Sequence, residues 1–334
     1  MSSMILTTAE CLTLCREAAL GAGAHDGAAT ALARATVAAE AAGNSAIGLG
    51  HFEFYLDALR AGRIDGRAEP AIERPLPSIF HVDARRGTAH YGYALVRDRL
   101  IAAVRTAGLG IFAQKNAFTC GALGYFAQQL AEAGLVALAA TNGPALITAA
   151  GGRRPVYCTN PLAFAAPLGG DDTLLIDQSS SQTAYVKLRQ AAERGESIPE
   201  GWAIDGRGRP TTDARAAIEG ALLAFGGARG ANIALMVEVL AAGLTGANWS
   251  LDAPSITQGP DSPQTGLFVL AVDPAAFGQG FAARLSDHAA RLEAEGIHIP
   301  GRARRERVAA AGRDGMRVPR ALVQRIAAFA DPAP

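Results

Sequence analysis

The stretch 109–140, LGIFAQKNAFTCGALGYFAQQLAEAGLVALAA, decides the fold class. Its short apolar segments Leu109–Gln114 and Leu135–Ala140 predict strands, and Ala122–Ala133 between them predicts a helix. A strand, a turn, a helix and a second strand in succession are typical of a protein that mixes α and β structure.

The same alternation extends outward from this stretch in both directions. Further strands are predicted at Ser78–Val82, Pro161–Ala166, Thr173–Gln178 and Phe268–Val272. Helices are predicted at Tyr93–Ala107, Ala214–Leu223, Ile233–Leu244 and roughly Ala276–Glu295, followed by a charged tail. Residues 7–42 predict two helices separated by Gly21–Gly27, with Thr7 or Thr8 as the first N-cap, and residues 49–62 predict a third. The fold class is therefore α/β with mixed α and β elements, and helices are enriched at the N-terminus.

The composition limits the class of protein. Of 334 residues, 49% are hydrophobic and 19% charged, which excludes a disordered chain. Lys+Arg and Asp+Glu are both 31, so the net charge is zero, and this disfavours nucleic acids and membranes as partners. Because Glu10, Arg16 and Glu17 interrupt the N-terminal segment and no long apolar run occurs, we expect a cytoplasmic protein.

The cysteines and histidines predict no metal site. Cys11 and Cys15 have no second pair and no nearby histidine cluster, which favours small buried hydrophobic residues over zinc ligands. The six histidines are scattered, and none has ligand spacing to another histidine or to a cysteine.

Two stretches match the letters of the Rossmann glycine motif, but neither has the required context. Gly108–Ala113 follows a predicted helix and precedes a strand, which indicates a helix C-cap. Gly278–Ala283 falls inside a helix that has already begun. P-loop, zincin and α/β-hydrolase motifs do not occur in the sequence, so it does not support any of these classes.

Several other segments resemble the malate/L-lactate dehydrogenase family in order and spacing. This family also contains sulfolactate, ureidoglycolate and diketogulonate dehydrogenases and Δ1-piperideine-2-carboxylate reductases. The matching segments are Gly43–Ile64, Asn116–Tyr125, Gly151–Pro167, Ile198–Asp213, Gly226–Gly246 and Ile299–Gly301.

The resemblance implies a non-Rossmann, sulfolactate dehydrogenase-like fold that binds NADPH or NADH. It implies a helical substrate-side region over residues 1–75, a central mixed-sheet cofactor domain over 76–275, and a C-terminal helix and tail over 276–334 that fold back on the first region. It also implies a homodimer with its active sites near the subunit contact.

The resemblance further implies where the cofactor contacts the chain. Five candidates lie between a predicted strand and helix, where backbone N–H groups suit a diphosphate: Thr119, Cys120, Gly121, Ala122 and Leu123. Others are Asp177, Gln178 and Ser179 at a strand end, and Arg229 and Gly230, where the family usually has Lys-Gly. The alternative for the first group is an ordinary strand–helix turn.

Two more sets of residues concern the cofactor's phosphate and the substrate. Arg302, Arg304 and Arg305 suit a 2′-phosphate and thus favour NADPH slightly over NADH, with a solvated basic tail as the alternative. Thr159 and Asn160, before a proline-started strand, are candidates for orienting a carboxylate or amide, with a simple β-turn as the alternative.

The chain departs from the family at the residues expected to move a proton. The family shows Ser-His-Gly followed by an Arg, in which Ser and His relay a proton and Arg holds the substrate carboxylate. Alignment places Ala46, Ile47 and His51 at these positions, and Thr119 replaces a second histidine. We therefore consider His51 as a catalytic and substrate-binding residue that enters the pocket from a shifted position, against a structural histidine. Lys187 is the other catalytic candidate, as a proton donor or a carboxylate anchor, against an exposed strand lysine.

Three functions follow as hypotheses. The first is hydride transfer between NAD(P)H and a small 2-oxo or 2-hydroxy acid of the malate, lactate or sulfolactate type. The second is reduction of Δ1-pyrroline- or Δ1-piperideine-2-carboxylate, because a protonated cyclic imine needs only a hydride and no enzymatic proton donor. The third is an inactive homologue that binds the cofactor.

Overall fold

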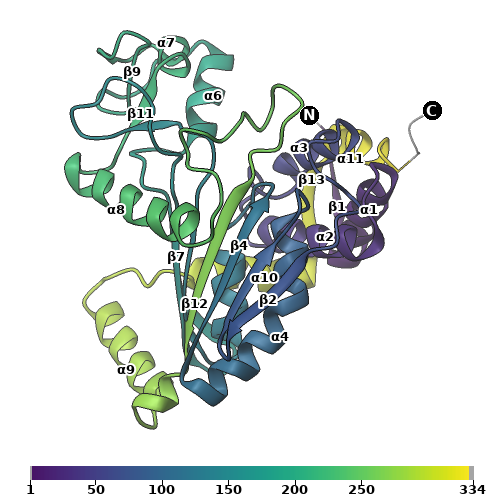
Figure 1. The fold of residues 1–334 in the computed structure, drawn as a ribbon, viewed down its shortest axis with the longest axis vertical. Coiled ribbons are helices and arrows are strands. Elements are labelled where there is room, and N and C mark those ends of the chain that lie inside the picture. Colours follow the sequence, from purple (N-terminus) through teal and green to yellow (C-terminus); the bar gives the residue numbers. More distant parts are fainter. Residues whose placement is uncertain (1, 331–334) are drawn as a thin grey trace.

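A seven-stranded mixed sheet forms the centre of the computed structural model, which describes residues 2–330 (Figure 1). The strand order is β2-β3-β4-β12-β5-β7-β8. The strands are β2 (Ala71–Leu76), β3 (Ile79–Asp83), β4 (Leu109–Ala117), β5 (Val136–Thr141), β7 (Leu162–Gly169), β8 (Asp172–Gln178) and β12 (Thr265–Val272). Strands β3 and β4 run parallel, whereas the other neighbours in this sheet are antiparallel. The predicted α/β class is confirmed.

Helices cover both faces of this sheet because its strands are apolar on both sides. In β12, Leu267 and Val269 pack into one buried cluster with α4 and α5, whereas Phe268 and Leu270 pack against α8 and η1 on the other face. These covering elements are α4 (Ala89–Ala107), α5 (Gly124–Glu132), α8 (Ala228–Glu238) and the π-helical turn η1 (Val239–Gly243).

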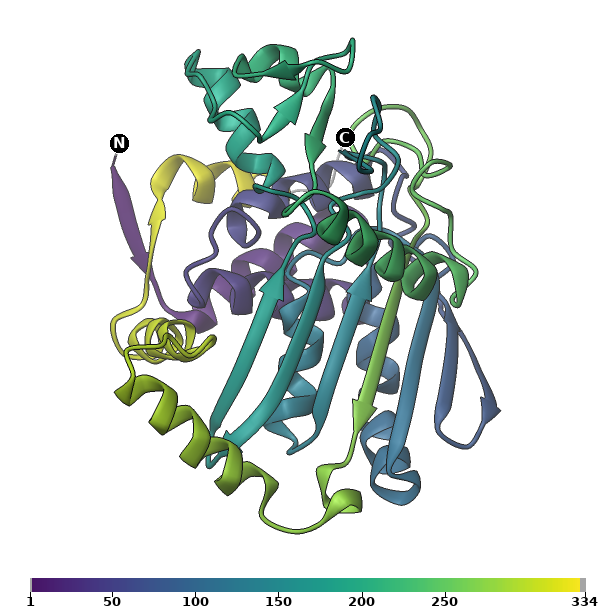
Figure 2. The ribbon, with the colours of Figure 1, turned by 90° about the vertical axis from the view of Figure 1, so that its left-hand side faces the viewer.

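A second, four-stranded sheet forms a small lobe beyond one end of the main sheet (Figure 2). Its order is β10-β9-β11-β6, and residues such as Ile147, Leu188 and Leu222 give the lobe a hydrophobic cluster of its own. The elements of the lobe are β6 (Ile147–Thr148), α6 (Tyr185–Arg194), β9 (Ala203–Ile204), β10 (Pro210–Thr211), α7 (Ala214–Ile218) and β11 (Ala221–Leu223).

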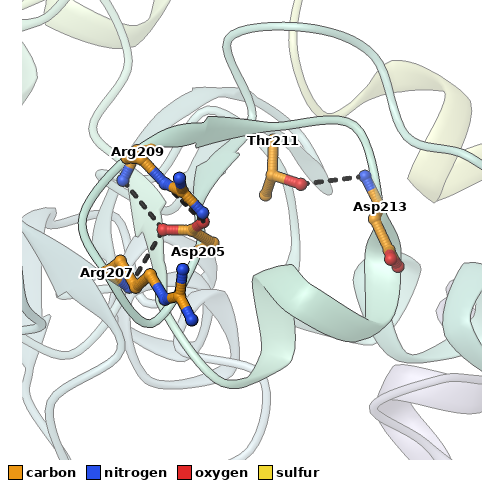
Figure 3. Close-up of polar contacts among 5 residues, drawn as sticks. All are labelled: Asp205, Arg207, Arg209, Thr211 and Asp213. Atoms are coloured by element: carbon orange, nitrogen blue, oxygen red, sulfur yellow. Dashed lines mark hydrogen bonds and ion pairs between the residues drawn. The ribbon is translucent and has the colours of Figure 1, made fainter.

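The turn between β9 and β10 is held by one carboxylate. Asp205 Oδ1 accepts hydrogen bonds from the N–H groups of Arg207 and Arg209, both at 2.9 Å, and Asp205 Oδ2 pairs with the Arg209 guanidinium at 3.0 Å (Figure 3). The hydrogen bond from the Arg209 backbone N–H is the largest of the effects that lower the pKa of Asp205. Thr211 Oγ1 accepts from the N–H of Asp213, which caps α7 (Figure 3). In the segment Ile198–Asp213, which resembles the family, these polar residues therefore hold the turn and the start of α7.

The N-terminal helices form a further layer against α4. They are α1 (Thr8–Gly21), α2 (Asp26–Ala41) and α3 (Leu49–Arg60). Thr7 caps α1 and makes a reciprocal capping box with Glu10, as predicted. Cys11 and Cys15 are free thiols in the core of this layer, and burial raises the pKa of Cys11 to about 11. Their predicted role as small hydrophobic residues is confirmed.

The C-terminal segment lies against the N-terminal one. Strand β13 (Met316–Pro319) pairs antiparallel with β1 (Ser3–Leu6), and α11 (Arg320–Ala327) packs on α1 and α3. Arg325 of α11 makes two hydrogen bonds to Glu53 of α3, at 2.7 and 2.9 Å. The end of the chain therefore supports the helix that carries His51.

Two predicted helices were wrong in their extent. The segment predicted as Ala214–Leu223 is α7 followed by β11, because the chain turns at Gly220, where a Cβ would lie 2.0 Å from the Ile204 carbonyl oxygen. The helix predicted from Ala276 is a 3₁₀ turn, η2 (Pro274–Phe277), followed by α9 (Phe281–Ala294). Gly278 and Gly280 separate the two at φ of 127° and 80°, so the glycine motif here precedes a helix instead of lying within one.

Two charged segments form helices that the sequence analysis missed. The predicted charged tail contains α10 (Arg302–Asp314) as well as α11, and Lys187 lies on α6, not on a strand. α10 has a weak hydrophobic periodicity, so its sequence gives little signal for a helix. α6 does carry apolar residues at helical spacing, with Leu188, Ala191 and Ala192 buried, so this helix could have been predicted from its sequence. Among residues 2–330, none of the helices is both long and apolar enough to cross a membrane.

Candidate active site

The turn between β4 and α5 is fixed by Tyr55 of α3. The Tyr55 hydroxyl donates to the Thr119 carbonyl oxygen at 3.0 Å and accepts from Thr119 Oγ1 at 3.2 Å. Cys120 in the same turn faces the core, where burial raises the pKa of its thiol to about 12. Thr119 and Cys120 therefore shape the backbone of the turn.

The next residues of this turn present free backbone donors. Within residues 2–330, the N–H groups of Gly121, Ala122 and Leu123 make no hydrogen bond. Gly121 has a φ of +64°, and a Cβ there would lie 3.3 Å from Tyr55 Oη and 3.7 Å from His90 Nε2. Free N–H groups that lead into a helix N-terminus are suited to bind a phosphate or another anion.

Asp177 meets this turn from the end of β8. Its Oδ2 accepts a hydrogen bond from the N–H of Gly124 at 2.8 Å. On balance the pKa of Asp177 is raised, because the surrounding protein removes water from the carboxylate. The hydrogen bond from the Gly124 N–H and the charge of Arg304 act in the opposite direction and only partly offset this. Gln178 is exposed, and Ser179 Oγ lies 2.9 Å from Ser181 Oγ. Of these strand-end candidates, Asp177 contacts the α5 N-terminus directly.

The three arginines of α10 have different surroundings. Arg302 pairs with Glu293 at 2.8 Å, and Arg305 pairs with Asp172 at 3.1 Å. Arg304 has no ion pair in the part of the chain that the structure describes, and its buried Nε has no hydrogen-bond partner. On balance the pKa of Arg304 is lowered, because burial disfavours its charge more than the nearby carboxylates of Asp177 and Glu132 favour it. Arg304 is therefore a desolvated cation beside Asp177, with its donors available.

Asn160 is buried in a polar network, away from solvent. Its amide donates to the Ala234 carbonyl oxygen at 2.8 Å and to Glu238 Oε2 at 2.7 Å. Glu238 also accepts from the N–H and the hydroxyl of Ser250, at 2.6 and 2.8 Å. Thr159 is only partly buried, so the network positions the backbone beside Thr159.

His51 lies in the first turn of α3, half-buried between aromatic rings. Its ring centroid is 5.2 Å from that of Phe54 and 5.3 Å from that of Tyr55. Burial, and then Arg189 of α6, lower the pKa of His51 to about 4. His51 is therefore a neutral imidazole at pH 7.

Lys187 and Arg229 lie away from this group. Lys187 is exposed and lines a cavity of about 340 Å³ together with Arg194 and Trp202. Arg229 is exposed at the start of α8, and Gly230 is buried where a Cβ would lie 2.2 Å from the Phe225 carbonyl oxygen. The structure thus places His51 against Tyr55, which holds the 119–123 turn, and Asp177 at the α5 start near Arg304. Lys187 and Arg229 do not contact these groups among the described residues.

The sequence model of malate/L-lactate dehydrogenase matches residues 6–327, nearly the whole chain. The chain belongs to the malate/L-lactate dehydrogenase family. It is 40% identical over 333 residues to the (2R)-3-sulfolactate dehydrogenase (NADP(+)) of Chromohalobacter salexigens, covering 99% of both chains. It is 36% identical over 290 residues to a Δ1-pyrroline-2-carboxylate/Δ1-piperideine-2-carboxylate reductase of Pseudomonas putida, covering 85% of each.

Solved structures of the family have the same fold. The Δ1-piperideine-2-carboxylate reductase of Pseudomonas syringae superimposes with a TM-score of 0.93 at 33% identity, covering 98% of this chain and 99% of that one. The sulfolactate dehydrogenase of Methanocaldococcus jannaschii superimposes with a TM-score of 0.85 at 26% identity, covering 98% of both chains. The predicted non-Rossmann, sulfolactate dehydrogenase-like fold is confirmed.

The family's proton-relay positions fall beside the free N–H turn. Ile47 lies next to Gly121, since a Cβ on Gly121 would be 4.0 Å from Ile47 Cγ2. Ala46 is exposed. An alkyl group therefore lies at the position that the resemblance aligns with the family's relay histidine, and the imidazole beside Gly121 is that of His90.

The sequence analysis missed Tyr55, His90 and Arg189. His90 Nε2 lies 2.9 Å from the Cys120 carbonyl oxygen, so it carries the ring proton, and the buried Nδ1 has no partner. Each of these three side chains acts on the site from a different helix. The sequence carries no periodic signal for such contacts, except that Tyr55 falls within the segment that resembles the family.

Proposed function

We propose that this protein is an NADPH-dependent oxidoreductase that reduces a small acid at the carbon next to its carboxylate. The observation that carries the proposal is the set of free N–H groups at Gly121–Leu123, which lie beside Tyr55 and His90 and lead to the α5 start that Asp177 contacts. Membership in the family over residues 6–327 supports the class of reaction.

The residues present suit a nicotinamide dinucleotide. The N–H groups of Gly121, Ala122 and Leu123 would hold the diphosphate, and the Asp177 carboxylate would accept hydrogen bonds from ribose hydroxyls. Arg304 would hold the 2′-phosphate that distinguishes NADPH from NADH, because its guanidinium has no partner of its own. When bound, the cofactor supplies the hydride, and the protein supplies position and charge.

The first candidate substrate is a 2-oxo or 2-hydroxy acid such as 3-sulfolactate. The relative from Chromohalobacter salexigens, which spans 99% of this chain, is named for that substrate and for NADP(+). Reduction of a ketone requires a proton for the new hydroxyl group, and His51, four residues after the relay position at Ile47, is the proposed donor.

The second candidate is a cyclic imine, Δ1-pyrroline- or Δ1-piperideine-2-carboxylate. The observation in its favour is that Ala46 and Ile47 replace the family's Ser-His relay, because an imine that arrives protonated needs no such donor. The reductases of Pseudomonas putida and Pseudomonas syringae support it by similarity.

One panel of substrates tests both candidates and the alternative of an inactive homologue. Purified protein is mixed with NADPH or NADH and with each 2-oxo acid or cyclic imine, and the nicotinamide absorbance is followed. Because the pKa of His51 is lowered to about 4, a 2-oxo acid reductase that uses His51 as its proton donor loses activity as the pH rises above about 4, whereas an imine reductase loses activity as the pH rises through the pKa of the imine itself. Absence of turnover with every substrate, together with intact NADPH binding, would establish the inactive homologue instead.

We further propose a homodimer in a reducing, cytoplasmic compartment. An exposed apolar surface on and after α8, called the α8 face below, supports the dimer; it comprises Leu235, Met236, Val239, Leu244, Trp249 and Leu251. Four free thiols support the compartment.

A further inference from the structure

Two cations of α6 point in different directions. Lys187 and Arg189 are two residues apart, which places them roughly 200° apart around a helix. Lys187 lines the cavity with Arg194 and Trp202, away from α3. The guanidinium carbon of Arg189 lies 5.6 Å from the ring centroid of Phe54, on α3.

Arg189 and His51 thus flank the same aromatic ring. The His51 ring is tilted by 38° relative to that of Phe54 with its centroid 5.2 Å away, and the Arg189 guanidinium lies over the Phe54 ring from α6. The charge of Arg189 reaches the imidazole, because it contributes to the lowered pKa of His51. A cation of the lobe and an imidazole of the N-terminal helices therefore lie close to the same aromatic ring.

The guanidinium of Arg189 is only weakly engaged. Its one ion pair in the described chain is with Glu193, one turn along the same helix, at 3.6 Å, and both side chains are partly exposed, at 43% and 65%. Ion pairs of this kind contribute little free energy. Arg189 can therefore exchange Glu193 for a better acceptor without a large cost.

Among residues 2–330, the cation that acts on the imidazole of His51 is Arg189. His51 replaces the arginine at this family position, but it is neutral at pH 7. The other titratable groups facing it are Tyr55 on its own helix and His90 on α4, whose pKa is also lowered to about 4 by burial. An anionic acid that binds beside His51 and Phe54 is within reach of the Arg189 guanidinium, and a guanidinium binds a carboxylate through two parallel hydrogen bonds.

We propose that Arg189 binds the carboxylate of the substrate across Phe54 from His51, and so replaces the arginine that this chain lacks on α3. The proposal rests on the proposed function, since it names the residue that selects an anionic substrate. It also separates the roles of the two α6 cations, with Lys187 outside the substrate site.

The test compares Arg189→Met and Arg189→Lys with the wild-type protein and with Arg194→Met as the matched control. Arg194 lies on the same helix, is exposed, and pairs with Glu196 at 2.9 Å. The measurements are the KM for the best substrate of the panel, and the Kd of oxamate, an unreactive acid, for the NADPH-loaded enzyme by calorimetry. The Kd of NADPH alone is measured as well.

We expect Arg189→Met to raise the KM and the oxamate Kd by roughly ten- to a hundred-fold, the worth of hydrogen bonds to a charged group. Arg189→Lys keeps the charge but loses the planar pair of donors, so its KM and oxamate Kd should lie between those of the wild type and of Arg189→Met. NADPH affinity stays unchanged in all variants, and Arg194→Met stays within about two-fold of wild type, because a surface ion pair contributes little.

Two results would overturn the proposal. One is an Arg189→Met enzyme that binds oxamate as wild type does, particularly if Lys187→Met loses that binding. The other is a parallel loss of NADPH affinity in Arg189→Met, which would indicate a structural or cofactor role. If the wild-type enzyme turns over no substrate, the proposed function fails, and oxamate binding still decides the role of Arg189.

Discussion

At the scale of single residues, Arg304 is the clearest determinant of cofactor choice. Its neighbours on α10, Arg302 and Arg305, are already paired with Glu293 and Asp172, whereas Arg304 has free donors beside Asp177. We predict that Arg304→Ala weakens NADPH binding by about ten-fold or more and leaves NADH binding nearly unchanged. Calorimetry with both dinucleotides measures this, and Arg305→Ala is the matched control, expected to have a small effect. An equal loss for NADPH and NADH would assign Arg304 to another part of the cofactor.

A second prediction at this scale concerns pH. Burial lowers the pKa of His90 from 6.5 to about 4, so below pH 6.5 the unfolded chain takes up a proton that the folded chain excludes. The free energy of unfolding should therefore fall as pH falls from about 6.5 to 4, by up to a few kcal/mol. Denaturant titrations at several pH values test this. His90→Gln should flatten the profile, whereas His288→Asn, at an exposed position, should not; equal profiles for His90→Gln and wild type would contradict the account.

The candidate site was only partly predictable from the sequence. The strand and helix on either side of the turn at 119–123 follow from the apolar pattern, but the choice of this turn and of Asp177 as candidates rests on the resemblance to the family. The structure places the two in contact through the Gly124 N–H. Tyr55, His90 and Arg189 reach the site from α3, α4 and α6, and only the packing of these helices brings them together. For the same reason Lys187 and Arg189 look equivalent in the sequence, although Lys187 lines a cavity of the lobe and Arg189 lies over the Phe54 ring.

At the scale of elements, helix packing on β12 depends on one glycine. A Cβ on Gly266 would lie 1.6 Å from the Ala241 carbonyl oxygen of η1, a backbone atom that cannot move aside alone. We predict that Gly266→Ala lowers the free energy of unfolding by at least about 3 kcal/mol.

The control for this prediction is Gly312→Ala in α10, where a Cβ would meet nothing within 4 Å. Alanine is the better helix former, so this variant should be neutral or stabilised by up to about 1 kcal/mol. Chemical denaturation measures both variants. A Gly266→Ala protein as stable as wild type would show that η1 does not pack on β12 as described.

Elements with a strong apolar pattern were predictable, and polar or glycine-broken ones were not. β4, α5 and β5 appear close to their predicted bounds because their apolar residues define them locally. α10 was missed because its sequence, RARRERVAAAGRD, is almost wholly polar on the exposed side, and it is positioned by contacts with α2 and β8. The lobe with β6, β9, β10 and β11 was missed because strands of two or three residues leave almost no periodic signal.

At the scale of the whole molecule, the α8 face predicts self-association. Leu244 and Leu251 on this face are 61% and 63% exposed, and a group of large apolar side chains exposed together is typical of a protein–protein contact. We predict that the wild type sediments as a dimer and that Leu244→Glu with Leu251→Glu shifts it toward monomer, because charged groups are costly at an apolar contact.

Phe277→Glu is the matched control for the dimer, since Phe277 is 83% exposed but lies on η2, away from α8. Sedimentation velocity at several concentrations gives the distribution. Dissociation by Phe277→Glu but not by the double variant would place the contact elsewhere.

The central claim is that this non-Rossmann chain binds a reduced nicotinamide dinucleotide at the Gly121–Leu123 turn. Calorimetric titration of the purified protein with NADPH tests it most directly. The account predicts saturable binding, tighter for NADPH than for NADH. The absence of binding heat with either dinucleotide, over a range of temperatures, would contradict it.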